Sequence, residues 1–285
     1  MKKSILSKIH ILAVVLLAGC SMTTAIPKDS ADTLCYFLDV GEGAAALIDS
    51  PELGRILVDT GNPSSRIIST INAMGITTVD KVIVTHPHPD HTGGIHNVME
   101  FLSPQAIYDN GETLELTEPA QRWYHENVRL DPRYVLLRAG DRMEKGDSVL
   151  EVLAPQKLAG DWNANSLVLL LSVGQSKVLF MADGTFVTEE TLFQSGRELS
   201  ADILQVGHHG SSAGSSERFL AEVRPEFAVI SVNKENINGY PAPQTRDRLE
   251  AQGAEVLCTC EYGDIVFAID AVTQKINFVK NERND

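Results

Sequence analysis

The chain has 285 residues, of which 43% are apolar and 22% charged, with a formal net charge of −14 at pH 7. This length and balance suit a globular protein of one large or two small domains, and they exclude a disordered chain. The acidic charge repels polyanions at long range and so argues against non-specific coating of DNA, although a nucleic-acid substrate held locally by metal ions stays open.

The N-terminal segment has the pattern of an export signal. Lys2 and Lys3 precede an apolar run over 9–17, which is shorter than the about 20 residues that a membrane-spanning helix needs. The following Leu-Ala-Gly-Cys resembles the lipobox of bacterial lipoproteins, with Cys20 as the lipidated residue; an ordinary secretory signal with a chance cysteine is the alternative. We expect a signal peptide over 1–19, a tether over 20–32, one domain over 33–280 and a tail over 281–285. The mature protein is then exported and anchored by lipid, on the outer side of the cytoplasmic membrane or in the outer membrane.

Beyond the tether, strands and helices alternate. The first predicted strands cover 34–40, 44–48 and 55–59, followed by a helix from about residue 67 to a stop at Gly75 and a buried strand over 81–85. The stretch 105–145 is less regular and is predicted to form a helix with connecting loops over the site. Further strands are expected over 149–153, 166–173, 177–181, 202–206, 227–232, 255–257, 265–269 and 275–279, with helices between the later ones. This pattern suits two sheets packed face to face with helices outside.

Three cysteines remain besides Cys20, and they do not form a disulfide scaffold. Cys35 lies in an early strand, and Cys258 and Cys260 are expected on one face of a late strand. One bridge among them is geometrically conceivable. A zinc site is the less favoured reading, because no histidine lies near them in sequence.

The densest group of metal-ligand side chains follows the strand over 81–85. His86, His88, Asp90 and His91 fall within six residues, and the prolines between them predict a loop rather than a helix. Imidazole and carboxylate together bind zinc, manganese or iron, and a metal ion lowers the pKa of bound water. The sequence therefore predicts a metal-dependent hydrolase.

These four residues match the HxHxDH signature, and the chain resembles the metallo-β-lactamase superfamily. The similarity extends to the lactamase-like domain of ComEC-type DNA-uptake proteins through five segments. They are 39–43 (DVGEG), 58–61 (VDTG), 165–169 (NSLVL), 181–184 (MADG) and 206–211 (VGHHGS). The resemblance implies an α+β fold, the four-layer αββα sandwich, with two divalent metal ions, zinc or manganese, between the sheets.

The resemblance also implies roles for single residues. His86 and His88 are expected to bind one metal, Asp90 and His91 the other, and Asp183 to bridge them. His208 matches the closing ligand of the second site, and His209 is its alternative. Asp59 resembles a carboxylate that orients a ligand histidine, with Asn165 as a further supporting residue. The carboxylates expected to act in catalysis are Asp90 and Asp183.

Two departures from the family pattern bear on metal and substrate. No histidine lies between His125 and His208, so the usual third histidine of the first site is missing. We expect a weaker first site that favours manganese. Tyr240 stands where a histidine is usual; it can donate a hydrogen bond to a phosphate oxygen or act as a weak acid toward a leaving group.

Three functions remain open at this point. The favoured one is a phosphodiesterase or nuclease-like hydrolase acting on a small-molecule or phosphodiester substrate, with DNA disfavoured by the acidic charge. The second is a hydrolase of a lactam, lactone or thioester. The third is a binding lipoprotein that keeps the metal and lacks catalysis.

Overall fold

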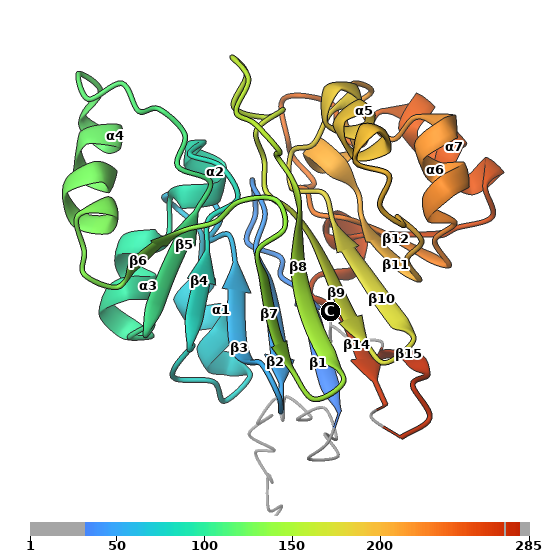
Figure 1. Ribbon diagram of the computed structural model, residues 1–285, viewed down its shortest axis with the longest axis horizontal. Helices are drawn as coiled ribbons and strands as arrows, with labels where there is room; N and C mark the ends of the chain where they lie inside the picture. Colours follow the sequence, from blue (N-terminus) through green and yellow to red (C-terminus); the bar gives the residue numbers. More distant parts are fainter. Residues whose placement is uncertain (1–31, 271, 280–285) are drawn as a thin grey trace, which may run out of the picture.

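The computed structural model describes residues 32–270 and 272–279, and Figure 1 shows its ribbon. The predicted signal peptide, the lipidation residue Cys20, the tether up to residue 31 and the C-terminal tail lie outside the described residues. The described chain forms two sheets that face each other, with helices on both outer sides (Figure 1).

The first sheet has eight strands in the order β15-β14-β1-β2-β3-β4-β5-β6. Neighbours from β15 to β3 pair antiparallel, and neighbours from β3 to β6 pair parallel. The strands are β1(Thr33–Phe37), β2(Ala46–Ser50), β3(Gly54–Val58), β4(Lys81–Ile83), β5(Ala106–Asp109), β6(Tyr134–Leu136), β14(Ile265–Ile269) and β15(Ile276–Val279).

The second sheet has seven strands in the order β13-β12-β11-β10-β9-β8-β7. Neighbours from β10 to β13 pair parallel, and those from β7 to β10 pair antiparallel. The strands are β7(Arg142–Lys145), β8(Ser148–Ala154), β9(Val168–Val173), β10(Ser176–Phe180), β11(Ile203–Gln205), β12(Phe227–Ile230) and β13(Glu255–Cys258).

Alternating side chains divide the core into layers. In β1, Cys35 and Phe37 join the core between the sheets, whereas Leu34 and Tyr36 face the helices outside the first sheet. A third apolar cluster fills the outer side of the second sheet. The helices are α1(Ile67–Ala73), α2(Pro89–Thr92), α3(Ile95–Phe101), α4(Pro119–Tyr124), α5(Phe186–Ser195), α6(Glu217–Val223), α7(Pro243–Ala251) and α8(Thr259–Tyr262). Two buried faces per sheet thus give the αββα sandwich, which confirms the predicted fold.

The stretch 105–145 differs from its prediction. It contains the strands β5, β6 and β7 besides α4 and a π-helical turn over His125–Arg129. These strands have three or four residues each, and β6 and β7 are mostly exposed. β5 and β6 are too short to show an alternation, and β7 is polar apart from Met143, so the apolar alternation that marks a strand in sequence is missing and the prediction was wrong here.

The cysteine prediction also needs a correction. Cys258 ends β13, but Cys260 lies in α8, so the two do not share one strand. They form a disulfide with each other, and Cys35 is a buried free cysteine. No helix within the described residues has the length and apolar character needed to cross a membrane.

Candidate metal centre

The histidine-rich segment leaves the carboxyl end of β4 and folds back at once into α2. Pro89 occupies the first turn of α2, where its missing N–H costs no hydrogen bond, so a proline that would break a helix interior is tolerated. The prediction of a pure loop is therefore corrected by one short helical turn. This turn places Asp90 and His91 side by side.

Two groups of side chains converge between the sheets. The first consists of His86, His88 and Asp183; the second consists of Asp90, His91, Asp183 and His209. Within each group the potential ligand atoms lie within 4.8 Å of one another. In the first sheet β3 and β4 are parallel, and in the second sheet β10, β11 and β12 are parallel. The segments that follow the carboxyl ends of β4, β10 and β11 carry the ligand residues of both groups.

Asp183 belongs to both groups. Its Oδ2 lies 3.7 Å from His86 Nε2, while its Oδ1 lies 3.1 Å from His91 Nε2 and 3.4 Å from His209 Nε2. Asp90 Oδ2 closes the second group at 3.3 Å from His209 Nε2. One carboxylate thus presents a separate oxygen to each group.

The second group has the character of a cation site. Its buried Asp183 Oδ1 lies 3.1 Å from His91 Nε2 and 3.4 Å from His209 Nε2 across ion-pair contacts, but none of these three buried atoms has a partner in hydrogen-bond geometry. Buried polar atoms without a partner are costly, and three that converge on one point call for a ligand. A divalent ion fits this donor set of imidazole nitrogens and carboxylate oxygens.

The buried charges reinforce one another. Burial works against charge on His91 and His209, yet the carboxylates beside them outweigh it and raise the pKa of both imidazoles, that of His91 well above its ordinary value. Burial likewise works against charge on Asp90 and Asp183, but the neighbouring histidines hold the pKa of both carboxyls below the ordinary value. Burial lowers the pKa of His86 well below its ordinary value. A bound cation would replace protons on the second group, because ligands bind metals in their deprotonated form.

Asp59 orients His91. Its Oδ2 accepts a hydrogen bond from His91 Nδ1 at 2.7 Å, and the same carboxylate accepts from the backbone N–H and hydroxyl of Thr85, each at 2.8 Å. The hydrogen bond fixes the proton on Nδ1, so Nε2 is left to face Asp183.

His86 has an orienting partner that sequence reasoning missed. The Ser166 hydroxyl lies 3.3 Å from His86 Nδ1 and also accepts the backbone N–H of Asp183 at 3.3 Å. Thr85 Oγ1 lies 3.1 Å from the same ring nitrogen. Ser166 stands in the segment over 165–169 that carries part of the resemblance, and this was the only signal in the sequence.

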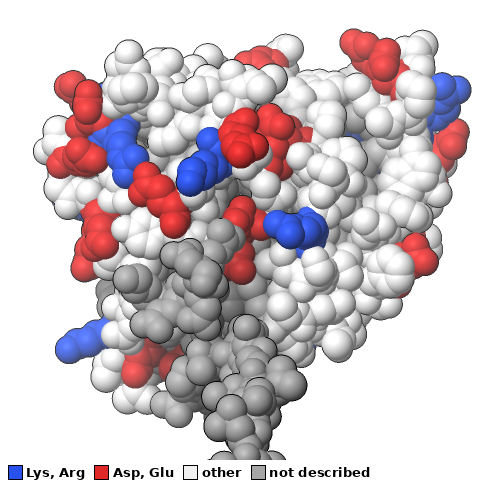
Figure 2. Space-filling model, turned by 180° about the vertical axis from the view of Figure 1, so that it is seen from behind, with Lys and Arg blue, Asp and Glu red and all other residues white. Residues whose placement is uncertain are grey.

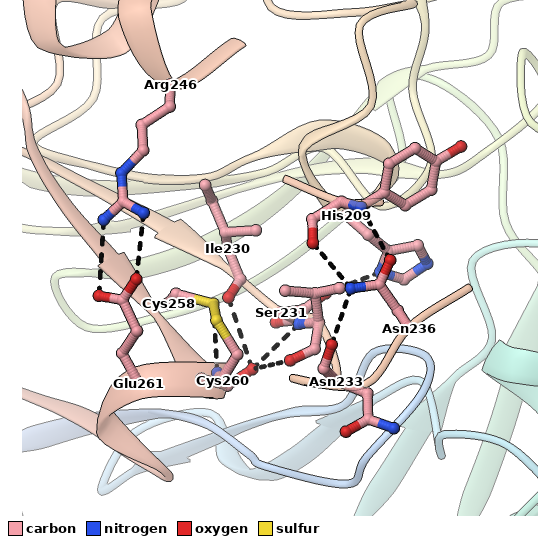
Figure 3. The surroundings of a disulfide bond; sticks show 12 residues. His209, Ile230, Ser231, Asn233, Asn236, Arg246, Cys258, Cys260 and Glu261 are labelled. Carbon is pink, nitrogen blue, oxygen red and sulfur yellow. Dashed lines mark hydrogen bonds and ion pairs between the residues drawn. A yellow bond between two sulfur atoms is a disulfide. The ribbon is translucent and has the colours of Figure 1, made fainter. Parts of the chain in front are cut away.

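His208 and His209, which follow β11, point to different groups of ligands. His209 is buried with Nδ1 bound to the carbonyl oxygen of Ser231 at 2.8 Å, and it joins the second group; Figure 3 shows it beside Ser231. The sequence favours His208 as the closing ligand of the second site, but its Nε2 lies at the edge of the first group, 3.9 Å from Asp183 Oδ2. Both have left-handed φ angles, 50° and 54°.

Two other predicted residues lie further out. The side chain of Asn165 binds Glu112 and the backbone of Ala159, so it supports the loop that approaches the site rather than the ligand histidines. Tyr240 packs against His208 with ring centroids 5.8 Å apart, and so stands at the rim.

Such a sandwich, with histidines and aspartates gathered between its sheets, defines the class of metal-dependent hydrolases. The chain belongs to the metallo-β-lactamase superfamily, whose family model matches residues 32–232.

Several curated proteins are similar to the chain, and two of them are named for competence and recombination. The chain is 26% identical to ComE operon protein 3 of Bacillus subtilis over 256 residues, covering 81% of this chain and 32% of that protein. It is 29% identical to competence protein ComA of Neisseria gonorrhoeae over 265 residues, covering 90% and 35%. It is 30% identical to recombination protein 2 of Haemophilus influenzae over 237 residues, covering 80% and 28%. The chain therefore spans about a third of the length of these relatives.

Solved structures share the fold. Igni18, a metallo hydrolase from Ignicoccus hospitalis, superposes with a TM-score of 0.54 at 14% identity, covering 82% of this chain and 99% of that one. The metallo-β-lactamase fold protein YhfI from Bacillus subtilis gives 0.53 at 15% identity, covering 79% and 96%.

Proposed function

We propose that this hydrolase cleaves phosphodiester bonds at a centre for two divalent metal ions. The observation that carries the proposal is the position of Asp183, which presents one oxygen to each of two adjoining groups of ligands. Two ions held close together by a shared carboxylate are typical of phosphatases and nucleases.

The proposal assigns a task to each residue. His86, His88 and Asp183 would hold the first ion, and Asp90, His91, His209 and Asp183 would hold the second. The ions would supply electrophilic activation of the phosphoryl group and of water. Asp59 keeps Nε2 of His91 free for its ligand role. The Tyr240 phenol donates a hydrogen bond to a phosphate oxygen from the rim.

The ions themselves are proposed to be zinc or manganese. The first group offers two imidazoles and one carboxylate oxygen, and His208 lies at its edge. Fewer nitrogen ligands suit a harder ion, so we assign the first site weaker binding and a preference for manganese. Protein purified without added metal that retains two tightly bound zinc ions would contradict this assignment.

Relatives and surface charge bear on the substrate. Those relatives named for competence and recombination favour a nucleotide phosphodiester, whereas the net charge of −14 disfavours a long polyanion. On the face that Figure 2 shows, lysine and arginine side chains stand apart from one another among acidic ones, without a continuous basic strip in the described part. A small phosphodiester meets both constraints.

The test compares two substrates and two variants. Protein starting at residue 21 is stripped of metal and offered bis-p-nitrophenyl phosphate and nitrocefin while manganese or zinc is added. We expect metal-dependent cleavage of the phosphodiester alone, and loss of at least about a hundredfold in Asp90→Ala and His88→Ala. Full activity of Asp90→Ala, or cleavage of nitrocefin alone, would overturn the proposal.

For location, we propose export and lipid attachment at Cys20. The support is the sequence over 1–20, with its basic start, short apolar run and Leu-Ala-Gly-Cys ending. Labelled palmitate should enter the full-length chain in bacterial cells and should not enter Cys20→Ala. Equal labelling of the two would contradict the proposal.

A further inference from the structure

An apolar cavity opens beside the metal centre. It has a volume of about 350 Å³ and is mostly apolar. We call it the tryptophan pocket, after its lining by Pro87, Pro89, Leu114, Trp123, Tyr124 and Trp162. Its volume falls within the range of small-molecule sites.

The tryptophan pocket adjoins the metal centre. Pro87 and Pro89 alternate along the chain with the ligand residues of the histidine-rich segment, so one backbone forms the wall of both. The ring of Trp162 packs against His88 with centroids 5.2 Å apart. A group seated in the pocket therefore lies next to whatever the centre holds.

The chemistry of the walls points to a flat, uncharged occupant. No lysine or arginine lines the cavity within the described residues, and its one acidic lining residue, Glu118, is exposed. This wall does not suit a phosphate group. Two indole rings and the proline faces instead offer surfaces on which an aromatic ring stacks, while Gln121 and His96 supply polar groups at the wall.

We propose that the tryptophan pocket binds a single aromatic ring of the substrate, such as a nucleobase, next to the scissile phosphodiester. The inference rests on the proposed phosphodiesterase function and deepens it. It makes the substrate a small phosphodiester with one unpaired aromatic group, since a base inside a duplex stack cannot enter the pocket.

The chain offers a binding test that does not depend on hydrolysis. Trp123 and Trp162 are its only two tryptophans, and both line the pocket, so the intrinsic tryptophan fluorescence reports on this cavity. Metal-free protein is titrated with thymidine, and with ribose 5-phosphate as the probe without a ring. We expect saturable quenching by thymidine and none by ribose 5-phosphate.

Variants make the test specific. Trp162→Ala should weaken thymidine binding about 5- to 150-fold, as expected for loss of one stacking platform, whereas Trp162→Phe should bind nearly as wild type. Phe101→Ala serves as a control, since Phe101 is an exposed aromatic residue of α3 outside the lining. Equal affinity in wild type and Trp162→Ala, or the absence of saturable quenching, would overturn the proposal.

The two proposals fail separately. Cleavage of bis-p-nitrophenyl phosphate without thymidine binding would remove the tryptophan pocket from the substrate site and leave the phosphodiesterase function standing. Thymidine binding without phosphodiester cleavage would keep the pocket as an aromatic site and remove the phosphodiesterase function.

Discussion

His208 and His209 are neighbours in the chain but have different surroundings. His209 lies within the second group of ligands, whereas His208 is half-buried, with Nε2 near Asn163 and Asp183. We expect His209→Ala to lose about one bound ion per chain and at least about a hundredfold in activity, because it removes an imidazole ligand. His208→Ala should keep the second ion. The number of metal ions bound per chain is measured in the two purified variants. Equal metal loss in both would contradict the assignment.

The sequence could not distinguish these two histidines. A reading by strand alternation assumes extended backbone, but here two consecutive residues have positive φ, which few residues other than glycine adopt. Asp59 and Ala182 share this conformation at the site, with φ of 61° and 47°. Backbone strain of this kind gathers at functional sites and depends on the surrounding fold, so it leaves no pattern in composition or spacing.

Asp59 provides a second test at the level of one side chain. Asp59→Asn keeps the shape but puts an amide N–H where the carboxylate accepts hydrogen bonds from Thr85 and His91. The tautomer of His91 is then no longer fixed, and metal affinity should fall about 10- to 100-fold. Competition with a chelator measures the loss. Unchanged affinity would show that His91 does not need this carboxylate.

The turn after β1 fixes the histidine-rich segment in place. The Ala44 N–H donates to the carbonyl oxygen of Asp90, and a Cβ built at Gly43 would lie 2.0 Å from that same oxygen. Gly43→Ala should therefore push the segment away and destabilise the fold by about 1–3 kcal/mol. Chemical denaturation and metal content together measure the effect.

A matched control lies two residues earlier. Gly41 also has a positive φ, 80° against 101° at Gly43, but a Cβ there meets nothing within 4 Å. Gly41→Ala carries a comparable backbone penalty without the collision, so the difference between the variants isolates the contact with Asp90. If both variants lose equal stability and metal, the close approach at Gly43 does not position the segment.

Among the elements, the sequence was most informative where strands are buried on both faces. The apolar runs near β1, β4, β9, β10 and β12 stand out because each is enclosed by two layers. The edge strands β6 and β7 could not be found in this way. Their pairing depends on neighbours contributed by distant parts of the chain, and their own side chains are largely solvated.

At the scale of the molecule, the core between the sheets protects the free cysteine. Burial raises the pKa of Cys35 to about 12, and only the thiolate reacts readily. For protein starting at residue 21 at pH 8, we expect no reactive thiol in the native state and one after denaturation. Denaturation with reductant should give three, because the Cys258–Cys260 disulfide then opens.

Thiol counting with a colorimetric reagent checks this prediction, and Cys35→Ala is its control. That variant should show no thiol after denaturation alone and two after reduction. A thiol that reacts rapidly in the native protein would mean that the sheets separate readily. Three thiols without reductant would mean that the disulfide does not form.

The shared carboxylate of Asp183 links metal binding to the stability of the folded protein. The ligands of the histidine-rich segment follow β4 of the first sheet, whereas Asp183 and His209 follow β10 and β11 of the second. Ions bound to both sets would therefore link the two sheets. An ion that binds only the folded chain, at a free concentration a hundred times its dissociation constant, adds about 2.7 kcal/mol to the free energy of unfolding. If the centre holds its ions as proposed, metal supply would set resistance to proteases as well as activity, and a cell short of metal would degrade this protein faster.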